Sequence, residues 1–312
     1  MHRPAWRDTF SALRIHNYRL YSVAQVISNT AGWMQRIAVD WLVLELTGSI
    51  ALVGLTIALQ FLPTLIFGAH SGLIADRLPK RAVLLVSQGV VGVLSVGLAV
   101  SAILGTAQLW FVYAIVLGIG VMQVIDLPAR SVFVQEMVGP RHLRNAISVN
   151  ASIFHLGALI GPALAGVIIA TAGTGWAIGF NAIAVVVGIV LIATIRTSEL
   201  LIAPRAPRER GQLRQAARYI ISKPTIFWTM VLVGVVAMFG MPMPALLAGM
   251  ADEVYNTGAT GYGFYNSLVA AGALLGALAS TRRATLRLRT IVFGALLYGV
   301  LQLVAGLAPF EL

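Results

Sequence analysis

Gly72-Leu-Ile-Ala-Asp76-Arg77-Leu-Pro79-Lys80-Arg81 is a short charged segment between two long apolar stretches. Basic segments recur along the chain, because all of its 22 Lys and Arg residues except Arg36 lie in alternate gaps between such stretches. The other basic gaps are the tail through Arg19, Arg130 to Arg144, Arg196 to Lys223 and Arg282 to Arg289. Short basic loops stay on the cytoplasmic side during membrane insertion. The alternation therefore predicts a polytopic membrane protein with a cytoplasmic N-terminus.

The composition agrees with a lipid environment. The mean hydropathy is +0.87, and only 11% of the residues are charged, against about 25% in a typical soluble domain. The net charge of +11 is divided among separate loops without interleaved aromatic residues, which argues against nucleic-acid binding. We assign this charge to topology and to contact with anionic membrane lipids. We expect a multi-pass protein of the cell (inner) membrane.

Nine apolar runs are long enough to cross a bilayer as helices, which requires roughly 20 residues each. We expect an all-α protein with a six-helix N-terminal bundle at 1–195, a cytoplasmic linker at 196–223 and a partial second bundle of three helices at 224–312. An odd number of spans places the C-terminal residues outside the cell. Two explanations remain open: a naturally nine-helix protein, or a fragment of a twelve-helix one. The runs are 20–46, 50–74, 82–104, 109–125, 146–170, 176–195, 226–250, 262–280 and 291–307.

The segment from Gly72 to Arg81 resembles the signature loop of the major facilitator superfamily, Gly-x-x-x-Asp-Arg-x-Gly-Arg/Lys-Arg/Lys, and follows the second span as in that family. Gly72 permits close helix packing, and Asp76 anchors the loop by accepting hydrogen bonds or an ion pair. Pro79 departs from the pattern, where the family usually has Gly. The remaining charge of this predicted conformational-switch loop comes from Arg77, Lys80 and Arg81.

The predicted fifth span resembles the Gly-rich segment of superfamily exporters that exchange substrate for protons. Gly157, Gly161 and Ala165 recur every four residues and form a smooth face, while Pro162 interrupts the helical hydrogen bonds beside it. Such a face serves as a bend or as a seam between helices. Ordinary packing of small residues is the alternative interpretation. The motif is Gly157-Ala-Leu-Ile-Gly161-Pro162-Ala-Leu-Ala-Gly166.

Further motifs resemble the drug and siderophore efflux branch of the superfamily, whose members are similar to the enterobactin exporter. They include Asp126-Leu-Pro-Ala-Arg130, which we expect to join the switch loop in a cytoplasmic charge network that also involves Glu136. Solvated loop charge is the alternative. One family feature is missing, because no Arg occurs in the middle of the fourth span near Ala114. The other matching segments are 14–19, 41–49 and 138–146.

Polar residues inside the predicted spans are candidates for a substrate or proton cavity. A charge in a span costs about 2.5–3.5 kcal/mol on insertion scales. Arg36 and Asp40 stand four residues apart on one helix face and are expected to pair, either in the cavity, where Asp40 exchanges protons, or as a structural pair near the outer interface. For the uncharged members, interhelical hydrogen bonding is the alternative role. These are Asn29, Gln60 and His155.

Together these patterns predict a secondary active transporter that works by alternating access. The resemblance implies proton-coupled efflux of an amphipathic small molecule, either a drug or a siderophore, with no cofactor and no metal. We expect a monomer. Catalytic and ATP-binding motifs are absent from the sequence, which argues against an enzyme and against ATP-driven transport. Two alternatives remain, a non-transporting membrane scaffold and, more weakly, a channel.

Overall fold

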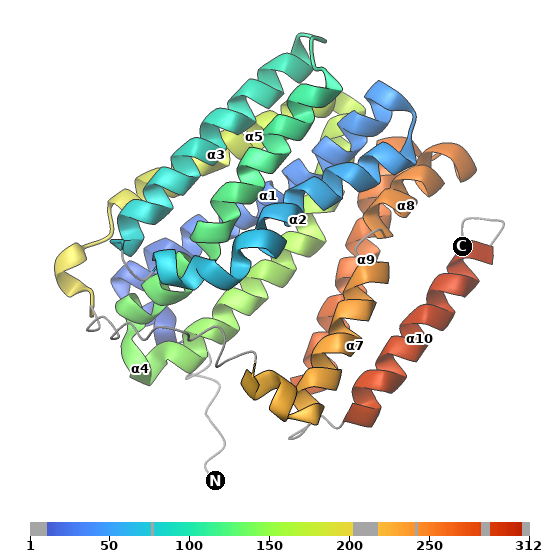
Figure 1. Ribbon diagram of the computed structural model, residues 1–312. Helices are drawn as coiled ribbons and strands as arrows, with labels where there is room; N and C mark the ends of the chain where they lie inside the picture. Colours follow the sequence, from blue (N-terminus) through green and yellow to red (C-terminus); the bar gives the residue numbers. More distant parts are fainter. Residues whose placement is uncertain (1–10, 76–77, 202–217, 241–242, 282–287, 308–312) are drawn as a thin grey trace.

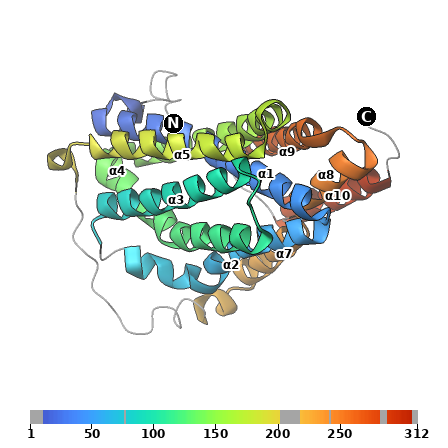
Figure 2. The same cartoon turned by 90° about the horizontal axis from the view of Figure 1, so that it is seen from above.

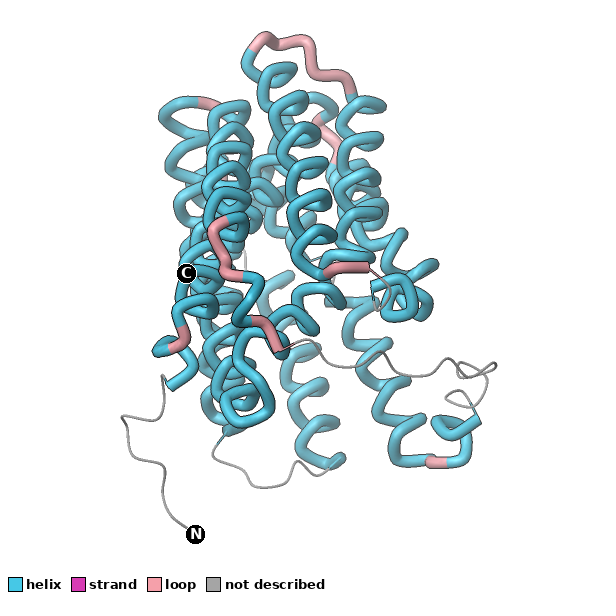
Figure 3. The backbone as a smooth tube through the Cα atoms, turned by 90° about the vertical axis from the view of Figure 1, so that its left-hand side faces the viewer, coloured by secondary structure: helices cyan, strands magenta, loops and turns pink. Residues whose placement is uncertain are grey.

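The computed structural model describes residues 11–75, 78–201, 218–240, 243–281 and 288–307. Within these ranges every regular element is a helix and no strand occurs (Figure 3). This agrees with the all-α prediction. The longer helices are α1 (His16–Thr47), α2 (Ile50–Ala75), α3 (Lys80–Ile103), α4 (Leu109–Ala172), α5 (Thr174–Ala193), α7 (Pro224–Gly240), α9 (Gly258–Thr281) and α10 (Leu288–Leu307). Shorter elements are Ser11–Arg14, Thr197–Glu199, α8 (Met243–Gly249) and the π-helical turn Met250–Val254.

Helices α1 to α5 pack together and occupy the left part of Figure 1. One apolar core lies among α1, α2, α3, α4, α5, α8 and α9 around Val43, Leu98 and Ile178. A second core lies toward the other end of the helices, where Tyr21, Phe133 and Ile192 are buried. The two cores fix the relative positions of the helices that surround the candidate site.

The start of α1 is tied to the end of α5 by reciprocal hydrogen bonds. The Asn17 side-chain amide donates to the Arg196 carbonyl oxygen over 2.9 Å, and the Arg196 backbone N–H donates to Asn17 Oδ1 over 3.0 Å. Asn17 is 1% exposed, whereas Arg196 is exposed, so both bonds are partly buried. These hydrogen bonds between residues far apart in sequence therefore connect the first and the last helix of the unit formed by α1 to α5.

Helix α4 is much longer than the predicted fourth span. The segment expected to be a polar loop after residue 125 is helical, and the chain turns only at Gly139, whose φ of 65° lies in the left-handed region that favours glycine. The helix continues because Ala129, Phe133 and Met137 recur every four residues and bury one face. Pro140 follows the turn, a position where its missing N–H costs little. The predicted loop boundary was therefore wrong, while the fifth span was placed correctly.

Helices α7 to α10 form the right part of Figure 1. In the turned view of Figure 2, α9 lies beside the second half of α4, and the Ser267 hydroxyl donates a hydrogen bond to the Leu159 carbonyl oxygen over 2.8 Å. The predicted span at 226–250 corresponds to α7 and α8, with residues 241 and 242 outside the described ranges. The junction between α4 and α9 is therefore the main contact of this region with the first helices.

Five helical segments in the described ranges are long and apolar enough to cross a membrane. Helix α1, whose second half carries Arg36, Asp40 and Glu45, is not among them. Large apolar side chains point outward, and Leu65 is 83% exposed and Val93 73%. An apolar exterior of this kind suits contact with lipid chains rather than with water. The five segments are 50–68, 80–103, 109–172, 174–193 and 226–254.

Candidate functional site

A cavity of about 270 Å³ lies among helices α1 to α5. It is lined by members of two groups that were predicted to lie apart: the candidate cavity residues, and the acidic and basic residues of the efflux motif. Its walls combine apolar side chains with many polar and charged ones, so the cavity is more polar than most small-molecule sites. The predicted residues that line it are Asn29, Arg36, Asp40, Gln60, Asp126 and Arg130.

Arg36 does not form the predicted ion pair with Asp40. Its guanidinium carbon lies 4.8 Å from the centroid of the Trp33 ring and 5.9 Å from that of Phe61. Among the described residues the ion pairs are Arg130–Asp126 and Arg196–Glu199, and Arg36 belongs to neither. A cation is attracted to the electron-rich face of an aromatic ring. The two rings therefore hold Arg36 at the cavity wall in place of its predicted acidic partner.

Asp40 is 7% exposed and turns toward α9 instead. The Tyr262 hydroxyl donates a hydrogen bond to Asp40 Oδ2 over 3.1 Å. Tyr262 is fully buried, and its ring stacks on Trp41 with the centroids 5.8 Å apart. Asp40 thus connects the cavity wall in α1 with the C-terminal helices.

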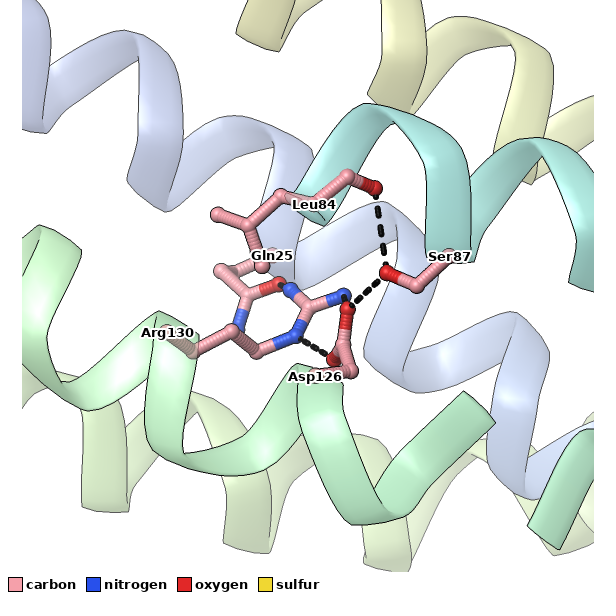
Figure 4. A network of polar contacts seen from close by, with 5 residues as sticks. All are labelled: Gln25, Leu84, Ser87, Asp126 and Arg130. Carbon is pink, nitrogen blue, oxygen red and sulfur yellow. Dashed lines mark hydrogen bonds and ion pairs between the residues drawn. The ribbon is translucent and has the colours of Figure 1, made fainter. Parts of the chain in front are cut away.

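Asp126 and Arg130 form a buried polar network (Figure 4). The Arg130 guanidinium donates to both carboxylate oxygens of Asp126, with Nη2 3.3 Å from Oδ1, and Nη1 also donates to Gln25 Oε1. The Ser87 hydroxyl donates to Asp126 Oδ1 over 2.6 Å. A bidentate contact between Arg and a carboxylate fixes the relative orientation of both groups. The network joins α1, α3 and α4 beside the cavity.

The predicted charge network at the switch loop stays a prediction, although Glu136 lies close enough to Lys80 for an electrostatic interaction. Arg81 does not approach Asp126; its guanidinium donates to the Ile192 carbonyl oxygen over 3.2 Å and to that of Ala193. These carbonyls end α5, where a positive charge is favourable. Lys80 begins α3, and its ammonium donates to the Leu78 carbonyl oxygen over 3.1 Å.

Two other members of the switch loop, Asp76 and Arg77, lie outside the described residues, and Gly72 falls in the last turn of α2. His155 is half-buried, and its ring lies 5.7 Å from the Phe154 ring. Phe154 lines the cavity, but His155 is absent from its described walls. His155 therefore does not join the other candidate cavity residues, whereas the loop's role stays a prediction.

The exporter motif in α4 packs against two helices through its small residues. A methyl group at Gly161 would come within 2.7 Å of both the Thr30 carbonyl oxygen and the Trp33 Cβ on α1. On α9, a methyl group at Gly166 would come within 2.7 Å of the Ala259 carbonyl oxygen. The remaining members follow the same division: Gly157 contacts Asn29 on α1, and the Pro162 carbonyl faces Gly263 on α9.

Sequence reasoning missed a buried group of uncharged polar residues. The Ser95 hydroxyl donates to Gln35 Oε1 over 2.9 Å, and the Asn181 amide donates to the same oxygen and to Ser95 Oγ over 3.3 Å. These bonds link α1, α3 and α5 at the cavity wall, which Gln35 and Asn181 line. In the sequence, these residues are visible as single polar residues within apolar spans, a feature that could have pointed to them. Similarly, the Asn29 amide donates to the Ile153 carbonyl oxygen over 2.9 Å, a bond between α1 and α4.

No cluster of three His, Asp or Glu residues that could bind a metal ion occurs in the described part of the chain. The polar groups of the cavity are instead suited to hydrogen bonding and to charge recognition. The charged groups of the cavity are two arginines, Arg36 and Arg130, and two aspartates, Asp40 and Asp126.

Comparison with known proteins identifies the family. The sequence profile of the family described as transmembrane secretion effector matches residues 7–310. The chain belongs to this family of major facilitator transporters. It is 26% identical over 287 residues to the enterobactin exporter of Shigella boydii and 27% identical over 283 residues to that of Salmonella typhi. These alignments cover 91% and 90% of the chain, and 68% and 67% of the relatives.

A solved structure supports the same fold. The crystal structure of a bacterial homologue of the human lysosomal transporter Spinster, inward-facing and unoccupied, matches with a TM-score of 0.63 and 17% sequence identity. The match covers 84% of this chain, and the chain spans 61% of the length of that protein. The predicted resemblance to major facilitator exporters is therefore confirmed. The chain is a helical member of a family of membrane transporters.

Proposed function

We propose that this protein is a secondary active exporter that moves an amphipathic small molecule by alternating access. The observation that carries the proposal is the cavity that brings Arg36, Asp40, Asp126 and Arg130 together between polar and apolar side chains of the helix bundle. Charged groups inside a membrane protein are costly and are usually kept for a transport pathway. The enterobactin exporters that match this chain support export of a drug-like or siderophore-like molecule.

We further propose that export is coupled to protons through Asp40. This carboxylate lies at the cavity wall, within reach of a substrate or of water, and contacts α9 through Tyr262. Protonation would remove its charge and change the strength of that contact. A transporter needs such a link between the state of its cavity and the relative position of its two parts.

The proposed topology follows the basic loops. Nine spans, with bundles at 1–195 and 224–312 and a linker at 196–223, would place the N-terminus in the cytoplasm. We propose a monomer surrounded by membrane lipids, with the switch loop and the exporter motif acting in conformational change. The small-residue contacts of α4 with α1 and α9 support this role, because they bring those backbones close together.

The test is transport in inside-out membrane vesicles that contain the full chain. A panel of fluorescent amphipaths with negative, neutral or positive head groups should include at least one that accumulates when a proton gradient is imposed. Accumulation should stop when a protonophore is added and in the Asp40→Asn variant. It should persist in Glu199→Gln, which alters an exposed ion pair far from the cavity. Folded protein without gradient-driven accumulation of any probe would overturn the proposal in favour of a scaffold.

A further inference from the structure

We infer that Arg36 is the docking point for a negatively charged group of the transported molecule, so that the substrate class is an aromatic or apolar anion. The inference rests on the proposed function and names its substrate class. It starts from an arginine that lines the cavity and makes no direct ion pair among the described residues, although Asp40 lies close enough to interact with it electrostatically. A buried cation of this kind requires a compensating group.

The guanidinium of Arg36 is held by rings and not by hydrogen bonds. Trp33, one turn earlier on α1, lies under it, and Phe61 contacts it from α2. Within the described part of the structure, Arg36 donates no hydrogen bond to the protein, and no fully buried side-chain nitrogen or oxygen lacks a partner. Its N–H groups therefore reach the cavity surface. A planar guanidinium with five donors matches the two oxygens of a carboxylate or similar anion.

The other charges of the cavity are already engaged. Arg130 contacts both oxygens of Asp126, and Asp40 accepts a hydrogen bond from Tyr262. This leaves Arg36 as the cavity arginine whose N–H groups are not engaged among the residues described. An anion that enters the cavity would meet a positioned donor there, whereas a cation would meet Asp126 already paired with Arg130 and Asp40 already bonded through one of its two oxygens.

The side chains that line the cavity around Arg36 indicate the chemical character of the rest of the ligand. Trp33 and Phe154 stack edge to face with centroids 5.6 Å apart, and Val91, Val116 and Ile119 line the same cavity. Aromatic and branched aliphatic walls favour an apolar or aromatic body attached to the anionic group. The cavity volume of about 270 Å³ is slightly below the smallest typical volume of a ligand pocket, about 300 Å³. The site therefore suits a small aromatic acid, or one arm of a larger molecule.

The test is direct binding to the purified full chain in lipid nanodiscs, measured by fluorescence at neutral pH. Three probes share one fluorophore: dansylglycine is an anion, dansylamide is neutral and dansylcadaverine is a cation. We expect dansylglycine to bind at least about tenfold more tightly than dansylamide, which corresponds to about 1.4 kcal/mol. Arg36→Gln should reduce this preference to within about twofold, because the charge-assisted hydrogen bonds are lost.

Two further variants keep the result interpretable. Arg36→Lys retains the charge without the planar fork and should keep a smaller preference for the anion. Arg196→Gln removes an exposed arginine outside the cavity and should leave the preference unchanged. If Arg36→Gln does not fold, Arg36→Lys and Trp33→Leu carry the test, and both should weaken dansylglycine binding more than dansylamide binding.

The outcomes separate this inference from the proposed function. Equal binding of the three probes, tighter binding of dansylcadaverine, or an unchanged preference in the Arg36 variants would overturn the docking role of Arg36, even if vesicles transport a probe. Preference for the anion without gradient-driven transport would support the docking site and overturn the proposed function. Preference together with transport of dansylglycine would support both.

Discussion

Tyr262 on α9 donates a hydrogen bond to Asp40 on α1, which connects two residues that are 222 positions apart in the chain. The bond reaches a carboxylate that lines the cavity, while the tyrosine ring packs on Trp41. The stacked rings of Tyr262 and Trp41 keep the two helices in contact at this point. The Tyr262 hydroxyl makes the contact sensitive to the charge on Asp40. The pair is therefore a physical link between the contents of the cavity and the position of the C-terminal helices.

Tyr262→Phe tests this link, because it removes the hydroxyl and retains the ring that stacks on Trp41. A hydrogen bond to a charged group contributes about 1.5–3 kcal/mol, so we expect a lower midpoint of thermal unfolding in detergent and weaker gradient-driven transport. Tyr219→Phe is the control, since Tyr219 is 58% exposed. Equal transport by Tyr262→Phe and the wild type would show that the hydroxyl has no part in coupling.

The close contact of Gly161 with α1 leads to a second prediction. Gly161→Ala places a methyl group within 2.7 Å of the Thr30 carbonyl oxygen, which forces the helices apart and should cost about 1–3 kcal/mol. The measurement is the fraction of monodisperse protein after heating. Gly89→Ala is the matched control, because a methyl group there meets nothing within 4 Å. Comparable heat resistance of the two variants would contradict the proposed close packing.

The buried pair of Asp126 and Arg130 leads to a third prediction. Removing one partner of a buried ion pair costs about 3–5 kcal/mol, because the other charge remains without compensation. Arg130→Met alone should therefore lower the thermal unfolding midpoint strongly, whereas Arg130→Met combined with Asp126→Leu should recover much of the loss. Glu199→Gln, at an exposed pair, should change stability by less than about 1 kcal/mol. A double variant less stable than either single variant would disprove the predicted cost of leaving one buried charge without its partner.

Much of the fold was predictable because apolar runs and turn residues act locally. The end of α1 at Gly48, with its φ of 61°, and the limits of α3 and α5 agree with the predicted spans within a few residues. The length of α4 was missed because Asp126 and Arg130 look like loop residues. They are instead satisfied inside the helix bundle by each other and by Ser87.

Part of the cavity lining was predicted, but not the pairing of its residues. The cost of burying charge identified Arg36 and Asp40 as cavity residues, and both line it. Helical spacing suggested that they pair with each other, but spacing carries no information about Tyr262 or Phe61 on other helices. Such partners depend on tertiary packing, and so do the bonds among Gln35, Ser95 and Asn181. Partner choice between distant helices was therefore the part that sequence patterns could not supply.

The orientation of the chain leads to a final prediction, which the absence of Cys makes straightforward to test. Thr106 lies between α3 and α4 and is exposed, while Ser198 follows α5 and is also exposed. If basic loops face the cytoplasm, Thr106→Cys should react with a membrane-impermeant maleimide added to intact cells, and Ser198→Cys should react only after permeabilisation. The reverse pattern would invert the topology, and with it the direction of transport that we propose.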